Sequence, residues 1–204
     1  MDIRLFTLGP FQTNGYLLSE GAKAVFVDPG DICHALQGLI HREGFRLTHV
    51  LITHMHIDHF YGAAALSAVT GAEIMAGSGD AFMVNDEMAE GPRWGYPLLG
   101  EDLDFTVIET NDLEILGRKC CVLSTPGHTP GSLTYYFPEE KVAFTGDLIF
   151  KESVGRTDFR GGDSSVLAHS IRRSILTLPG DTVLYPGHGP STTVAHEKKY
   201  NPWC

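Results

Sequence analysis

The chain has 204 residues, with 25 acidic against 15 basic side chains and a formal net charge of −10. The length fits one large domain, so we expect a single domain over residues 1–204. The acidic balance argues against a nucleic-acid partner, which would need a basic surface. No apolar run approaches the roughly 20 residues that span a bilayer, so no membrane partner is expected.

The predicted elements of the first half alternate between strands and helices. Strands are expected over 3–8, 16–19, 24–28, 50–53 and 73–76. Helices are expected over 32–43, where Asp31 is the predicted N-cap, and over 60–69. The stretch 85–104 is interrupted by glycine and proline and is expected to be an irregular loop. This stretch is expected to be either a surface loop anchored by a few aromatic side chains or, because long irregular loops in compact domains are often functional, a loop over the active site with Trp94 or Tyr96 at the substrate.

The second half is dominated by strands. They are expected over 105–108, 113–116, 120–124, 133–137, 141–144 and 182–185, together with a helix that Asp163 can cap and that runs to about residue 178. Strands accompanied by helices in each half predict an α/β (α+β) protein, with two sheets sandwiched between helical layers, an αββα arrangement.

The four cysteines form no C-x-x-C pair, and the N-terminus lacks the pattern of a secretory signal. We therefore expect reduced thiols and a cytoplasmic location.

A dense group of metal-binding side chains follows the predicted strand at 50–53. It contains His54, His56, Asp58 and His59. In an extended chain, side chains two apart share a face, so the first two histidines can converge on one ion. Three histidines and a carboxylate within six residues are hard to explain by packing, and they favour a metal site.

Three further polar residues each follow a predicted strand and a glycine: His128, Asp147 and His188. Glycine lets the backbone turn sharply, and strand ends are where α/β folds collect their sites. Each residue alone is a weak signal, but together with the first group they complete a ligand set.

The motif H-x-H-x-D-H, followed at a distance by His, Asp and His, resembles the metallo-β-lactamase superfamily over nearly the whole chain. The resemblance implies two metal ions. It assigns His54, His56 and His128 to the first ion, Asp58, His59 and His188 to the second, and Asp147 to a bridge between them. Imidazole and carboxylate ligands suit Zn²⁺, which we expect, with iron or manganese as alternatives.

The expected chemistry is hydrolysis. Two ions about 3.5–4 Å apart can share a water and lower its pKa, giving a bridging hydroxide that attacks a carbonyl carbon. Asp58 and Asp147 are the expected catalytic carboxylates, the first also as a proton acceptor.

The run Gly155-Arg156-Thr157-Asp158-Phe159 and the turn 187–193 resemble short bacterial glyoxalase II-like hydrolases. The resemblance implies a small-molecule thioester substrate such as S-lactoylglutathione. Arg156 either contacts substrate or pairs with Asp158 to brace its loop. The alternative function is a persulfide dioxygenase, which shares the same run but would use a single iron held by His54, His128 and Asp147.

Overall fold

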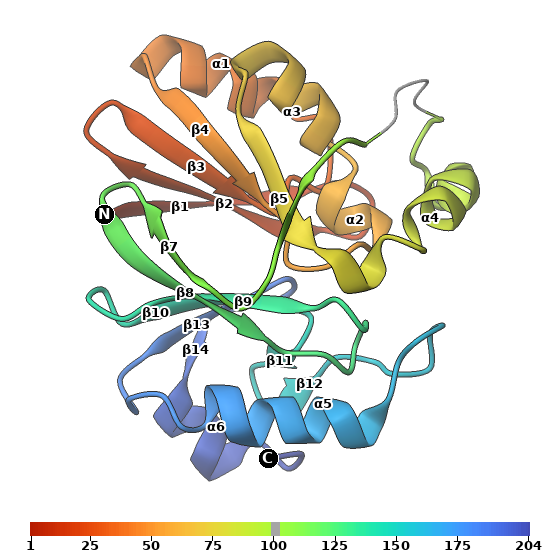
Figure 1. The fold of residues 1–204 in the computed structure, drawn as a ribbon, viewed down its shortest axis with the longest axis vertical. Coiled ribbons are helices and arrows are strands. Elements are labelled where there is room, and N and C mark those ends of the chain that lie inside the picture. Colours follow the sequence, from red (N-terminus) through yellow and green to blue (C-terminus); the bar gives the residue numbers. More distant parts are fainter. Residues whose placement is uncertain (99–102) are drawn as a thin grey trace.

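Two six-stranded sheets pack face to face, and helices cover the outer face of each (Figure 1). The computed structural model describes residues 1–98 and 103–204. Both sheets mix parallel and antiparallel neighbours, which confirms the expected sandwich of two mixed sheets flanked by helices. Among the helices of these residues, none is both long and apolar enough to cross a membrane.

The first sheet comes from the N-terminal half of the chain and keeps sequence order. Its strands are β1 (Asp2–Leu8), β2 (Thr13–Glu20), β3 (Lys23–Val27), β4 (Arg46–Leu51), β5 (Glu73–Gly77) and β6 (Thr106–Ile108). The strands from β3 to β6 run parallel to one another, so β3, β4 and β5 end at the same edge of the sheet.

The second sheet has the order β14-β13-β10-β9-β8-β7. Its strands are β7 (Asp112–Ile115), β8 (Arg118–Ser124), β9 (Leu133–Phe137), β10 (Val142–Gly146), β13 (Val183–Pro186) and β14 (Thr192–Thr193). A separate hairpin joins β11 (Ile149–Phe150) to β12 (Ser153–Val154).

The helices are α1 (His34–Glu43), α2 (Ile57–Phe60), α3 (Ala63–Thr70), α4 (Val84–Glu90), α5 (Ser164–Ser170) and α6 (Val194–Tyr200). Figure 1 shows α1 and α3 over the first sheet and α5 and α6 over the second.

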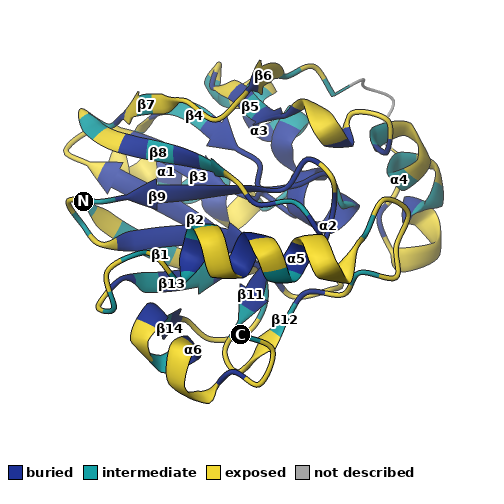
Figure 2. Ribbon diagram, turned by 60° about the horizontal axis from the view of Figure 1, so that its bottom comes forward, coloured by how far each residue is buried: buried dark blue, intermediate teal, exposed yellow. Residues whose placement is uncertain are grey.

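Three clusters of buried apolar side chains hold the sheets and helices together. Along β3, Ala24 and Phe26 pack among the helices of the first sheet, whereas Val25 and Val27 pack between the two sheets. This is the two-residue alternation of a strand covered on both faces. A third cluster fills the space between the second sheet and α5 and α6. Figure 2 shows the strands of both sheets largely buried.

Several predicted helix boundaries were wrong. Helix α1 begins two residues later than expected, at His34, and its N-cap is Cys33, whose Sγ accepts from the backbone N–H of Leu36. The helix expected over 60–69 is divided into α2 and α3. The division lies at Gly62, where a Cβ would overlap the backbone carbonyl of Asp31.

Near the C-terminus, the cap at Asp163 is confirmed. Its carboxylate accepts hydrogen bonds from the backbone N–H groups of Ser165 and Val166. The helix that follows changes to a π-helical turn at Ile171–Ile175. The α6 and β14 elements were missed, although Thr193 caps α6 by accepting from the N–H of His196.

The expectation of an irregular loop over 85–104 was wrong for its first half. Helix α4 is followed there by a 3₁₀ turn at Gly91–Trp94. No residue of α4 is fully buried, but Val84 and Met88 pack against the first core cluster. This contact could not be predicted from the sequence of the segment. Residues 99–102 of this predicted loop lie outside the described residues.

Candidate metal centre

All seven predicted metal ligands meet at one edge of the sandwich, where strands of both sheets end. His54 and His56 follow β4, and Asp58 and His59 lie in α2. The other three follow strands of the second sheet: His128 after β8, Asp147 after β10 and His188 after β13. In the second sheet β10 and β13 are parallel neighbours, and β8 runs in the same direction because the antiparallel β9 lies between it and β10. All three strands therefore end at this edge, as expected for sites of α/β folds.

The first group consists of three histidine rings. Nε2 of His54 lies 3.1 Å from Nδ1 of His56, and Nε2 of His128 lies 2.9 Å from the same atom. The three ring nitrogens are all within 4.8 Å of one another, so they could hold one metal ion.

The second group consists of Asp58, His59 and His188, whose ligand atoms are also within 4.8 Å of one another. Oδ2 of Asp58 lies 3.2 Å from Nε2 of His188 and 3.6 Å from Nε2 of His59. Asp147 lies between the two groups, with its oxygens 3.4 Å from Nε2 of His59, 3.6 Å from that of His188 and 3.7 Å from that of His128.

Two buried polar atoms at this point lack a hydrogen-bond partner among the described residues: Nε2 of His59 and Oδ1 of Asp147. Leaving such groups unpaired in a protein interior costs about 1–3 kcal/mol each. A cation between them would satisfy both. Imidazoles and carboxylates with no thiolate form a donor set that fits divalent metal ions.

Hydrogen bonds to the second nitrogen of each ring orient these histidines. Nδ1 of His59 bonds Oδ2 of Asp28 at 2.9 Å, and Nδ1 of His128 lies 2.7 Å from the backbone oxygen of Arg156. Nδ1 of His54 lies 3.1 Å from Oγ1 of Thr53. In metal sites, such a bond on one ring nitrogen fixes the tautomer and points the other nitrogen at the ion.

Two buried aspartates in this scaffold were missed by the sequence analysis. Asp28, directly after β3, accepts from the backbone N–H and the hydroxyl of Thr53 as well as bonding His59. Asp80 accepts from the backbone N–H groups of Met55 and Gly131. The available signal for Asp28 was its position at the end of an apolar run, followed by Pro29-Gly30, and for Asp80 its position shortly after an apolar run, behind Gly77-Ser78-Gly79.

Burial and neighbouring charges set the protonation of the cluster. Burial and the adjacent imidazoles hold the pKa of His54 well below its usual value and lower the pKa of His56 to about 3. Burial would raise the pKa values of Asp58 and Asp147, but the nearby His59 outweighs it and holds both low. Neutral imidazoles and ionised carboxylates are the forms that bind metals.

His59 is the exception. Burial by itself would lower its pKa, but the carboxylates of Asp58, Asp147 and Asp28 outweigh burial and raise it well above the usual value. A metal ion bound there would replace the proton on Nε2, since a ligating imidazole must be neutral.

One glycine is required by close packing at the centre. A Cβ on Gly187 would overlap the carboxylate of Asp147. The turn that carries His188 can therefore approach Asp147 only because residue 187 has no side chain.

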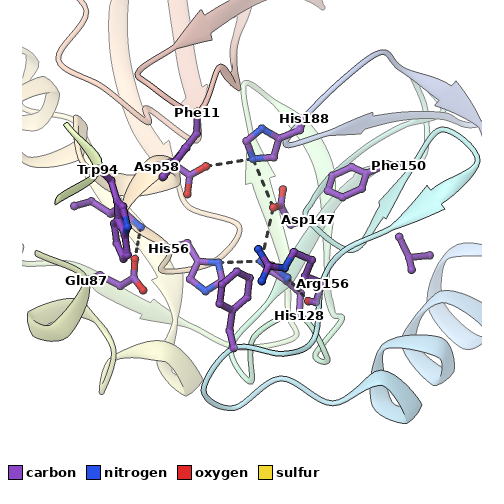
Figure 3. Close-up of a pocket in the computed structure, with 13 residues that line it drawn as sticks. Phe11, His56, Asp58, Glu87, Trp94, His128, Asp147, Phe150, Arg156 and His188 are labelled. Carbon is purple, nitrogen blue, oxygen red and sulfur yellow. Dashed lines mark hydrogen bonds and ion pairs between the residues drawn. The ribbon is translucent and has the colours of Figure 1, made fainter. Parts of the chain in front are cut away.

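A cavity of about 560 Å³ opens over the cluster (Figure 3). Its lining consists of Phe11, His56, Ile57, Asp58, Glu87, Trp94, His128, Asp147, Phe150, Val154, Arg156, Phe159 and His188.

The predicted substrate residues divide on this surface. Trp94 and Arg156 line the cavity, whereas Tyr96 does not. The Tyr96 ring is only 1% exposed because it packs against Tyr61 and beneath Phe11, with ring centroids 4.9 and 6.0 Å away. The expectation that Tyr96 faces the substrate was therefore wrong.

Comparison with known proteins identifies the family of this chain. Residues 8–188 match the family described as the metallo-beta-lactamase superfamily. The chain is 35% identical to hydroxyacylglutathione hydrolase GloC of Haemophilus influenzae, over all of this chain and 98% of that protein. Two proteins of known crystal structure are each 35% identical in sequence to this chain. BLEG-1 B3 metallo-beta-lactamase has a TM-score of 0.91 over 99% of both chains, and the di-iron-bound form of TTHA1623 has 0.89 over 98% of this chain and 100% of that one. The match over most of its length shows that the chain belongs to the metallo-β-lactamase superfamily.

Proposed function

We propose that this protein hydrolyses a small-molecule thioester, of the kind represented by S-lactoylglutathione, at a centre of two divalent metal ions. His54, His56 and His128 would hold the first ion. Asp58, His59 and His188 would hold the second, and Asp147 would bind both. The observation that carries the proposal is that a second complete group of ligand atoms lies beside the first. The ligand atoms of this second group are all within 4.8 Å of one another.

Two divalent ions in such a site supply a Lewis acid for the carbonyl oxygen and lower the pKa of a shared water. The protein positions the carboxylates around this chemistry. The hydroxyl of Thr13 donates to Oδ2 of Asp58 at 2.7 Å and so fixes its orientation at the cavity wall. We assign Asp58 the transfer of a proton from the added hydroxyl group to the departing thiolate. It would carry that proton only transiently, because bound cations favour the ionised carboxylate.

The similarity to a hydroxyacylglutathione hydrolase over the whole chain supports thioester hydrolysis. The alternative is a dioxygenase with one iron at His54, His128 and Asp147, and the Gly155–Phe159 run at the cavity favours it. The two functions differ in their need for the second group, because only the dinuclear hydrolase uses His188.

The test compares apoprotein reloaded anaerobically with Zn²⁺ or Fe²⁺. Thiol release is followed with S-lactoylglutathione and with S-lactoyl-N-acetylcysteamine, and oxygen uptake with glutathione persulfide. Nitrocefin is tested as a further candidate substrate, because one structural neighbour is a metallo-β-lactamase. We expect cleavage of at least one thioester with either metal, and its loss in His188→Ala. Oxygen uptake with iron alone, retained in His188→Ala and accompanied by no thioester cleavage, would favour the dioxygenase.

A further inference from the structure

Apart from the proposed metal ligands, the wall of the cavity is mainly apolar. Six side chains provide this surface: Phe11, Ile57, Trp94, Phe150, Val154 and Phe159. Several of them also pack against ligand rings. Phe159 lies 4.9 Å from the ring of His56, and Phe150 lies 6.2 Å from that of His188. A substrate whose reacting carbonyl lies at the centre must therefore place its neighbouring atoms against aromatic and aliphatic groups.

Within the described lining, Arg156 is the single Lys or Arg side chain, and it already has a partner. Its Nε donates to Oδ1 of Asp158 at 2.9 Å, and a terminal nitrogen donates to Oδ2 at 2.8 Å. Its guanidinium carbon lies over the ring of Phe159, 4.5 Å from the ring centre, so the group also contacts the aromatic wall. An incoming carboxylate would therefore meet a guanidinium whose charge is already offset by Asp158 and whose Nε edge is occupied, with only the remaining Nη hydrogens left to donate.

The other charged wall residue outside the proposed ligand set is Glu87 of α4 (Figure 3). Its Oε2 accepts from the backbone N–H of Ile57 at 2.9 Å, and no Lys or Arg of the described chain forms an ion pair with it. The rim formed by Glu87, Arg156 and Asp158 therefore carries a negative net charge when all three are ionised.

We propose that this cavity selects thioesters whose thiol portion is uncharged and apolar over thioesters of an anionic thiol such as glutathione. The inference rests on the proposed thioester hydrolysis. Glutathione brings two carboxylates and one ammonium group to the wall. Its carboxylates meet the like charges of Glu87 and Asp158, and the one cationic side chain of the wall, Arg156, is already paired with Asp158. Carboxylates without partners at a partly buried apolar surface are disfavoured, and like charges placed against each other add to the cost.

The first measurement compares kcat/KM of the zinc-loaded enzyme for S-lactoylglutathione and S-lactoyl-N-acetylcysteamine, which share one acyl group. The assay is run at pH 8, because burial raises the pKa of Glu87 and its ionised form is wanted. We expect the neutral thioester to be favoured by about 10-fold, which is the effect of about 1.4 kcal/mol.

Asp158→Asn tests the cause, since it leaves Arg156 free to bind a carboxylate. The ratio of kcat/KM for the glutathione thioester to that for the neutral one should rise by about 3- to 10-fold, as expected for a gained ionic contact. Asp112→Asn is the matched control. It frees Lys119 of β8 from another exposed ion pair, with Asp112 of β7, away from the cavity, and should leave the ratio unchanged.

A binding measurement separates this inference from the proposed reaction. Calorimetric titration with S-hexylglutathione and S-hexyl-N-acetylcysteamine needs no turnover. Tighter binding of the neutral thioether, with the difference reduced in Asp158→Asn, would support the selectivity even in a preparation that cleaves neither thioester. The proposal is overturned if wild type prefers the glutathione compound in binding, or if Asp158→Asn and Asp112→Asn give the same ratio.

Discussion

Asp80 joins the two loops that carry the first group of histidines, and its replacement by asparagine tests how far those loops depend on it. Asp80 is fully buried. Its Oδ2 accepts from the N–H of Met55 at 3.2 Å and from the hydroxyl of Thr129 at 2.6 Å, and its Oδ1 accepts from the N–H of Gly131 at 2.6 Å. Met55 lies between the first two histidines and Thr129 follows the third, so one carboxylate connects both loops.

Asp80→Asn keeps the shape of the side chain but replaces one acceptor by an NH₂ group. The hydroxyl of Thr129 can rotate, but a backbone N–H cannot change from donor to acceptor. In either amide orientation, the new NH₂ therefore faces the N–H of Met55 or of Gly131. An unpaired buried donor costs about 1–3 kcal/mol, and the remaining bonds lose the assistance of the charge, so we expect a loss of about 2–4 kcal/mol in the free energy of unfolding.

The assay is urea unfolding followed by circular dichroism, with excess chelator so that bound metal does not contribute. With an m-value of about 2 kcal/mol/M, the midpoint should fall by about 1–2 M. Asp163→Asn is the control, because Asp163 also accepts two backbone N–H bonds, at 2.8 and 3.0 Å, but at a helix N-cap. Asparagine caps helices as well as aspartate does, so its midpoint should hardly change. An unchanged midpoint in Asp80→Asn, or equal losses in both variants, would refute this reasoning.

The metal assignments and the cavity wall give two further predictions. Asp147→Ala should lower the metal content of both sites, because the oxygens of Asp147 lie within 3.7 Å of histidines from both groups. His188→Ala should reduce the metal content from two ions per chain to about one. Elemental analysis after dialysis measures both effects, and two ions retained in His188→Ala would contradict the assignment. Trp94→Ala should lower kcat/KM several-fold at unchanged metal content, because it removes part of the cavity wall. Trp203 is exposed near the C-terminus, so Trp203→Ala should leave kcat/KM unchanged. Equal kcat/KM values in the two variants would show that Trp94 does not contribute to substrate binding.

The seven candidate ligands could be picked out from the sequence because their signals are local. His54, His56, Asp58 and His59 lie within six residues, directly after an apolar strand, and the other three candidates each follow a strand and a glycine. The order of strands and helices, together with the resemblance to a known superfamily, likewise predicted the layered fold. The ion pair of Arg156 with Asp158 was also foreseeable, since the two are separated by one residue and their charges are opposite.

Only the tertiary structure decided which residues support that site. Asp28 and Asp80 bond partners 25 to 51 residues away, and nothing in their neighbouring sequence names those partners. Trp94 and Tyr96 are two residues apart in a segment with no periodic pattern, yet one lines the cavity and the other is buried. The physical reason is that a short-range pattern fixes which side chains share a face of a strand or helix. Which face meets the solvent, the core or the cavity depends on the packing of segments that are distant in the chain.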